Sequence, residues 1–327
     1  MKKHYKLAAL FILFSGIYNV AFGHILLDTT SVLFIGNSFT NDNNCPDVFR
    51  NLANQAKSAI HVETVIHLGG SVKNYINNDT CWRTIKSRKW DYIVFQDLQS
   101  CYSDTAGIFP KDILDDNIKF QAKIKKLLPC AKIIYVAGWE KLDAFKDRFP
   151  GDNIKRLIHR IMMNYAFLNN KPNVHNIIAP VGLAWLRSLQ TNHDIALYVT
   201  SDYRHPAKRG TYLYAIVIFT TIFKYSPDYN LFYSGISSKD AHLLCKCGYR
   251  AVMDTIDYTN LKTSSLKIHK MGNTWYANPF YKHYQWFKNN LPIQDAHQFS
   301  FMKPDKKSIY TAKAIDWKGC IKTSFGF

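Results

Sequence analysis

Short continuous apolar runs alternate with segments of helical periodicity along most of this chain. Five runs rich in β-branched and aromatic residues predict strands at 31–36, 61–68, 90–95, 132–137 and 174–179. Between them, apolar residues recur every three or four positions and predict helices at 46–60, 111–128 and 153–168. A strand that is apolar throughout is buried on both faces, so this order predicts a three-layer α/β/α fold with a five-stranded parallel sheet.

The pattern changes after two further predicted helices, at 206–224 and 238–255. From about residue 258, Lys, Asn, Tyr, Trp and His predominate, and short β-like fragments lie at 274–276 and 297–302. We expect a main domain over residues 24–257 and a C-terminal extension over 258–327 that is β-rich. Aromatic residues in so short a segment favour a small core, with a sugar-stacking surface as the alternative. These residues are Trp275, Tyr276, Tyr281, Tyr284, Trp286 and Phe287.

The N-terminus has the pattern of a secretory signal peptide. Met1-Lys-Lys-His-Tyr-Lys6 is basic, residues 7–22 are almost free of charge, and Ala21-Phe22-Gly23 offers small residues for cleavage. The apolar run is shorter than the roughly 20 residues of a membrane span, although a retained anchor helix remains the alternative. We expect a signal peptide over residues 1–23, a secreted or periplasmic protein, and no stable membrane insertion after cleavage.

The composition excludes a disordered chain but leaves the partner open. Hydrophobic residues make up 47% and aromatic residues 15% of the 327 positions, which is ample for a core. The net charge is +18, or +15 without the three lysines of the predicted signal peptide, and such a charge attracts anionic molecules. A solvated, lysine-rich surface explains this charge as well, so we predict no nucleic-acid partner, and the oligomeric state stays open.

Secretion would place the seven cysteines in an oxidising compartment, where disulfides form. They are Cys45, Cys81, Cys101, Cys130, Cys245, Cys247 and Cys320. Cys81 and Cys101 flank the third predicted strand and are one candidate pair, while the odd number leaves at least one thiol unpaired. Cys245-Lys-Cys247 lies near His242, but no second ligand pair has the spacing of a zinc site, so we predict no metal.

Candidate catalytic residues follow the first predicted strand and precede the helix at 206–224. Ser38 lies in Gly36-Asn-Ser38, which taken alone is an ordinary strand-to-helix turn. Asp202 and His205 stand three residues apart much later in the chain. A serine hydroxyl needs a base to take its proton, and an acid group fixes the tautomer of that base, so the three residues suit a catalytic triad.

Polar and glycine residues also follow the second and third predicted strands, at Gly69-Gly70-Ser71 and Gln96-Asp-Leu-Gln-Ser100. In a parallel sheet, ligands bind at the carboxyl ends of the strands. We therefore expect Ser38, Gly70 and the two glutamines, Gln96 and Gln99, to converge on one edge.

Three of these segments resemble the sequence blocks of the SGNH, or GDSL-like, hydrolase family, in the family's order. Phe34-Ile-Gly-Asn-Ser-Phe-Thr40 resembles the first block, Leu68-Gly-Gly-Ser71 the second, and Asp202-Tyr-Arg-His205 the last. The segment Pro180-Val-Gly-Leu-Ala-Trp185 looks like the secreted or lipid-anchored bacterial members. The third block departs, because Gln96-Asp-Leu-Gln-Ser100 stands where the family has Gly-x-Asn-Asp.

The resemblance implies a flavodoxin-like α/β/α fold and a serine esterase without metal or organic cofactor. It implies that Ser38 attacks an ester, that His205 is the base oriented by Asp202, and that the Ser38 and Gly70 N–H groups form an oxyanion hole. Gln96 or Gln99 would replace the missing asparagine there. We expect a small-molecule or glycan ester, most simply an acetyl ester on a carbohydrate. A lipid esterase, an O-acyltransferase and a non-catalytic protein that binds glycans or a host partner remain alternatives.

Overall fold

The computed structural model describes residues 29–103, 110–141, 152–227, 232–261, 265–279, 281–302, 305 and 307–326. The predicted signal peptide lies outside these residues. Within the described ranges, no helix is both long enough and apolar enough to cross a membrane.

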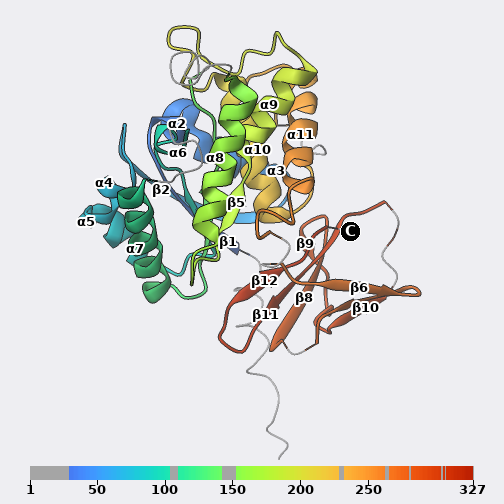
Figure 1. Cartoon of the computed structure of the whole chain (residues 1–327). Coiled ribbons are helices and arrows are strands. Elements are labelled where there is room, and N and C mark those ends of the chain that lie inside the picture. The colour runs from blue at the N-terminus through green and yellow to red at the C-terminus, as the bar shows by residue number, and fades with distance from the viewer. Residues whose placement is uncertain are drawn as a thin grey trace, which may run out of the picture.

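A five-stranded parallel sheet forms the centre of the molecule, in the order β2-β1-β3-β4-β5 (Figure 1). The strands are β1 (Thr29–Gly36), β2 (Ala59–Ile66), β3 (Tyr92–Phe95), β4 (Lys132–Val136) and β5 (Ile177–Ala179). This is the strand order of flavodoxin-like folds, so the predicted fold class is confirmed. Each predicted strand is present, and no bound differs from the prediction by more than three residues.

Helices cover both faces of the sheet, because the side chains of each strand alternate between the faces. In β1, Val32 and Phe34 join one hydrophobic cluster, and Leu33 and Ile35 join the other. The first cluster packs under α3 (Cys45–Gln55), α9 (Val181–Thr191), α10 (Lys208–Phe223) and α11 (Ser238–Met253). The second packs under α4 (Val72–Ile76), α5 (Asp79–Lys86), α7 (Lys111–Leu127) and α8 (Ile154–Asn169).

One of these helices is shorter than the sequence predicted, whereas α10 agrees with its predicted range within two residues. The helix expected over 46–60 ends at Gln55, because Lys57 takes a left-handed conformation (φ 56°) and the chain turns directly into β2. Helix α10 is buried along almost its whole length, which explains why its sequence shows no polar face. Its position between α3, α9 and α11 makes it the core of its layer.

The C-terminal extension forms two antiparallel sheets, in the orders β10-β7-β6 and β12-β11-β8-β9. Their strands are β6 (Ile268–Met271), β7 (Thr274–Ala277), β8 (His283–Lys288), β9 (Leu291–Pro292), β10 (Ser300–Met302), β11 (Tyr310–Ile315) and β12 (Ile321–Thr323). Trp286 is fully buried between them and stacks on Phe301 at 5.6 Å. Most of the aromatic residues singled out in the sequence therefore form the core of the extension.

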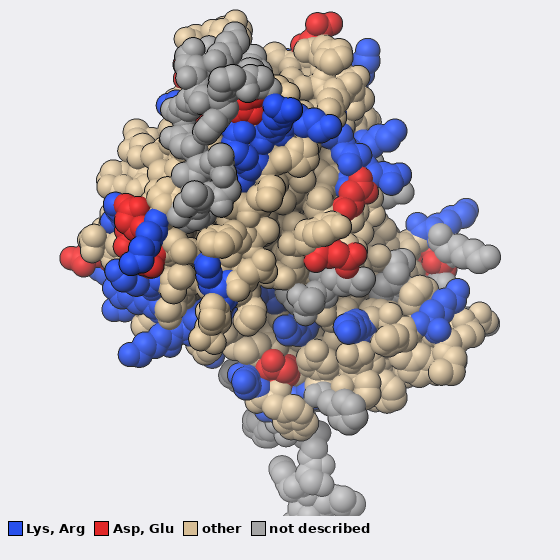
Figure 2. Space-filling model, in the orientation of Figure 1, with Lys and Arg blue, Asp and Glu red and all other residues tan. Residues whose placement is uncertain are grey.

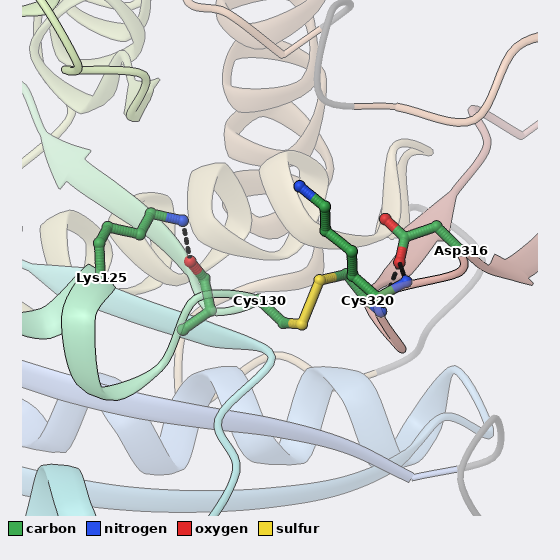
Figure 3. The surroundings of a disulfide bond; sticks show 6 residues. Lys125, Cys130, Asp316 and Cys320 are labelled. Atoms are coloured by element: carbon green, nitrogen blue, oxygen red, sulfur yellow. Dashed lines mark hydrogen bonds between the residues drawn. A yellow bond between two sulfur atoms is a disulfide. The ribbon is translucent and has the colours of Figure 1, made fainter.

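A disulfide joins this extension to the main domain (Figure 3). It links Cys130, just before β4, to Cys320, just before β12, across 190 residues of sequence. The candidate pair Cys81 and Cys101 is wrong: both are free thiols, and Cys81 is fully buried in the hydrophobic cluster under α7. The extension thus lies at the amino ends of the parallel strands, away from α2 (Ser38–Asn41) in Figure 1.

Candidate active site

The turn after β1 presents Ser38 at the carboxyl edge of the sheet. Gly36 is required there, because a Cβ at this position would lie 2.4 Å from Thr40 Oγ1. Asn37 caps the short helix α2 by accepting a hydrogen bond from the Phe39 N–H (3.1 Å). Its Nδ2 donates to the Gly70 carbonyl (3.0 Å). Asn37 therefore fixes the turn and ties it to the loop after β2, a role that the sequence analysis did not assign.

The structure brings Ser38, His205 and Asp202 together in one hydrogen-bonded series. His205 Nε2 lies 2.9 Å from Ser38 Oγ, and His205 Nδ1 bonds to Asp202 Oδ2. Asp202 Oδ1 also accepts bonds from the N–H groups of Arg204 (2.9 Å) and His205 (3.1 Å). Burial acts to raise the pKa of Asp202, but these hydrogen bonds outweigh it and hold the pKa at about 2. A charged Asp202 keeps the proton of neutral His205 on Nδ1 and leaves Nε2 free to accept from Ser38.

Aromatic side chains hold the imidazole from the side. The ring of Phe39 meets His205 edge-on, with centroids 5.4 Å apart. Trp139 stacks on the other side of Phe39 at 5.0 Å and on Trp185 at 4.0 Å. These rings are buried, and that of Phe39 packs against the imidazole of His205, whose own side chain remains 30% exposed.

The loop after β4 contacts the loop that carries Asp202 and His205, which we call the acid–base loop. Trp139 Nε1 donates to the Arg204 carbonyl (2.9 Å), and Glu140 Oε1 forms an ion pair with Arg204 Nε (3.3 Å). Tyr203, between the acid and the base, has a left-handed backbone (φ 50°), a conformation that costs a non-glycine residue about 1–3 kcal/mol. Sequence reasoning missed Trp139 and Glu140. Their position just after a predicted strand, at the edge where the other polar segments gather, was the available signal.

Gln96 and Gln99 are not placed as oxyanion donors. Gln96 Oε1 accepts bonds from the Asn37 N–H (3.1 Å) and from Thr40 Oγ1 (3.0 Å), while its Nε2 donates to the Asp97 carbonyl. Gln99 Nε2 donates to the carbonyls of Asp97 and Val136, and its Oε1 accepts from the Gly138 N–H (3.0 Å). Both side chains are almost fully buried. The expectation that either amide binds the oxyanion is therefore corrected, because Gln96 bonds to groups at the ends of β1 and β3, and Gln99 bonds to groups at the ends of β3 and β4.

The N–H of Gly70 is also occupied, since it donates to the His67 carbonyl (2.8 Å) in a tight turn. A Cβ at Gly70 would lie 2.7 Å from that carbonyl, which explains the glycine. The preceding Gly69 is exposed, with φ 67°. In the described part of the chain, the N–H groups of Gly69 and Ser38 have no acceptor, and Ser38 lacks one because it begins α2.

Asp97 fixes the end of the loop that follows β2 and contains Gly70. Its fully buried carboxylate accepts bonds from the N–H groups of Val72 and Leu98 (both 2.8 Å) and from the Tyr102 hydroxyl (2.6 Å). Burial raises the pKa of Asp97 from its ordinary value, against the effect of these hydrogen bonds. Because Val72 begins α4, this carboxylate fixes where the loop around Gly70 ends.

One more carboxylate faces the site. Asp42, in the 3₁₀ turn Asp42–Asn44, interacts electrostatically with both His205 and Asp202, and partial burial raises the pKa of Asp42. Across the described ranges, no three His, Cys, Asp or Glu side chains gather closely enough to hold a metal ion.

No protein-family model matches the sequence, and no curated protein is similar to it. A DUF4886 family protein from Bacteroides uniformis has a similar structure, with a TM-score of 0.59 and 17% identity over 69% of this chain and 95% of that one. A variant of an acetylxylan esterase from Geobacillus stearothermophilus aligns with a TM-score of 0.44 and 13% identity, over 58% and 92% of the two chains. Only the first likeness is close enough to bear on this chain, and at that identity it concerns the fold alone.

Proposed function

We propose that this protein is a secreted serine esterase that hydrolyses an acyl ester, most simply an acetyl group on a carbohydrate. The observation that carries the proposal is the hydrogen-bonded series from Asp202 through His205 to Ser38, assembled from segments 167 residues apart in the sequence. Three polar side chains meet in this order at the edge of a parallel sheet where such folds bind ligands. The resemblance of the same segments to SGNH hydrolases supports the same chemistry.

In the proposed reaction, Ser38 Oγ attacks the ester carbonyl carbon while its proton passes to His205 Nε2. The tetrahedral intermediate collapses when His205 gives this proton to the leaving alcohol, and an acyl-serine remains. Water then attacks the acyl-serine in the same way, with its proton moving to His205 and on to Ser38 Oγ as the carboxylic acid leaves. Asp202 stabilises the imidazolium that forms in each half-reaction.

The oxyanion would be bound by backbone N–H groups. Ser38 supplies one, because its N–H is free at the start of α2. We assign the second to Gly69 in place of Gly70, because the Gly70 N–H already donates to His67. Removing one such donor typically lowers the rate by about 100- to 1000-fold.

The openness of the site favours an acyl group carried on a large molecule. The side chain of His205 is 30% exposed and that of Asp202 is 38% exposed, so a polymer chain can lie across them. A glycan O-acyltransferase would use the same side chains with a sugar hydroxyl in place of water. Analysis of the products separates the two, because only a hydrolase releases the free acid in the presence of an acceptor sugar.

The test is hydrolysis of short-chain p-nitrophenyl esters by the secreted protein and by the variants Ser38→Ala and His205→Ala. Each substitution should lower kcat by at least about 1000-fold. His61→Ala is the matched control, because His61 pairs with Glu63 at 2.8 Å on the surface and contacts no serine nucleophile. Hydrolysis that survives in Ser38→Ala would overturn the proposal.

A fluorophosphonate probe provides a second readout that does not depend on the ester chosen. It should label the wild-type protein and His61→Ala but not Ser38→Ala. A wild-type protein that neither hydrolyses esters nor reacts with the probe would support a non-catalytic binding protein on the same fold.

A further inference from the structure

Arg204 lies inside the acid–base loop, directly before His205, and its guanidinium is held at one nitrogen. Nε forms the ion pair with Glu140 Oε1 at 3.3 Å, and the Glu140 side chain is only 3% exposed. The backbone of Arg204 is fixed as well, because its carbonyl accepts the Trp139 indole bond and its N–H donates to Asp202. Both ends of the side chain are thus anchored to buried parts of the structure.

The two terminal nitrogens of Arg204 have no hydrogen-bond or ion-pair partner among the described residues, and the side chain is 45% exposed. A guanidinium is planar, so its two terminal nitrogens present N–H groups side by side as a fork. That fork matches the two oxygens of a carboxylate. By contrast, Arg187 bonds to Asp254 through a terminal nitrogen (2.6 Å), so its fork is already in use.

Arg204 is bound to the segments that carry the reacting groups. Arg204 is the chain neighbour of His205, and its partner Glu140 is the chain neighbour of Trp139, which stacks on Phe39 next to Ser38. The carboxylates of Asp42 and Asp202 both interact with His205, and Arg204 is the cation that precedes it in the chain.

We propose that Arg204 binds a carboxylate of the substrate, so that the natural substrate is an acylated acidic glycan, such as one containing uronic acids. This rests on the proposed esterase function and narrows it to a substrate class. The overall charge fits, since 42 Lys and Arg stand against 24 Asp and Glu. Figure 2 shows blue Lys and Arg side chains across the face drawn, and such a field concentrates polyanions near the surface.

The test compares two matched substrates, acetylated oligogalacturonides and the same oligosaccharides with their carboxylates converted to amides. The wild-type protein should show a kcat/KM about 10- to 100-fold higher for the acidic form, the effect of a charge-assisted, two-point contact. The difference should lie in KM and should shrink as salt is added. Arg204→Gln should bring the ratio close to one, Arg204→Lys should give an intermediate ratio, and Arg187→Gln should leave it unchanged.

Equal kcat/KM for both substrates in the wild-type protein, or a preference that survives in Arg204→Gln, would overturn the inference while the esterase stands. A wild-type protein that does not hydrolyse p-nitrophenyl esters would instead count against the proposed function. In that case, a binding measurement still tests whether Arg204 contacts the substrate carboxylate. Measured by calorimetry, acidic oligosaccharides should bind to Ser38→Ala about 10-fold more tightly than to the double variant Ser38→Ala/Arg204→Gln. Equal affinities would refute the contact.

Discussion

Replacing Gln99 by methionine separates a structural role from an oxyanion role for this side chain. Methionine keeps the length and unbranched shape of glutamine but removes its amide. In the structure, that amide accepts from the Gly138 N–H at 3.0 Å and donates to the carbonyls of Asp97 (3.0 Å) and Val136 (3.2 Å). The substitution therefore disconnects the end of β3 from the end of β4 and leaves the catalytic series untouched.

The size of the effect follows from the groups left without partners. The side chain of Gln99 is 1% exposed, so water cannot replace the lost acceptor of the Gly138 N–H. One buried donor without a partner costs about 1–3 kcal/mol, and the carbonyls that lose a donor add to this. We expect Gln99→Met to lower the free energy of unfolding by about 2–4 kcal/mol. If the amide instead bound the oxyanion, stability would change little and kcat would fall by about 100- to 1000-fold.

The assay combines denaturant unfolding with a measurement of kcat on a p-nitrophenyl ester. Active sites are counted by fluorophosphonate labelling, so that kcat is calculated for folded molecules only. We expect kcat per labelled site to stay close to that of the wild-type protein. Gln121→Met is a matched control, because Gln121 is also buried but bonds to Asn176, in the hydrophobic layer away from Ser38. Unchanged stability together with a 100-fold lower kcat in Gln99→Met alone would refute the structural assignment.

Two further predictions concern the C-terminal extension. Replacing Cys130 and Cys320 by serine should lower the free energy of unfolding by up to about 5 kcal/mol, since the bond closes a loop of 190 residues. The denaturant curves of this variant should coincide with and without reductant, and ester hydrolysis should be retained. Wild-type denaturant curves that do not respond to reductant would contradict this prediction. Burial, with a further contribution from Lys322, lowers the pKa of Lys132 to about 7. Between pH 7 and about 10 the unfolded chain then binds more protons than the folded one, so wild-type stability should rise with pH over this range, and Lys132→Met should flatten the profile.

Much of the fold was predictable because its signals are local. The inner strands are apolar and buried along most of their length, and the edge strand β2 alternates apolar and polar residues, so all five strands could be found as short runs before the sheet was known. The parallel order then placed the carboxyl ends of those strands at one edge. The helix over 46–60 was drawn too long because apolar periodicity continues past Gln55, whereas the left-handed turn at Lys57 has no strong sequence signal.

The sequence by itself determined which three residues would meet at the candidate site. Ser38 follows directly after a strand, and Asp202 and His205 share one short loop, so a single contact between two segments assembles the series. Its catalytic role stays a prediction until activity is measured.

Only the tertiary structure decided the partners of the remaining polar groups. The amides of Gln96 and Gln99 looked free in the sequence, but the position of β3 between β1 and β4 directs them at backbone groups. The contact between the loop after β4 and the loop before α10 sets Glu140 against Arg204, and the docking of the extension joins Cys130 to a cysteine 190 residues away. A hydrogen bond or a disulfide depends on distances of a few ångströms between segments remote in sequence, and residue type and spacing do not encode those distances.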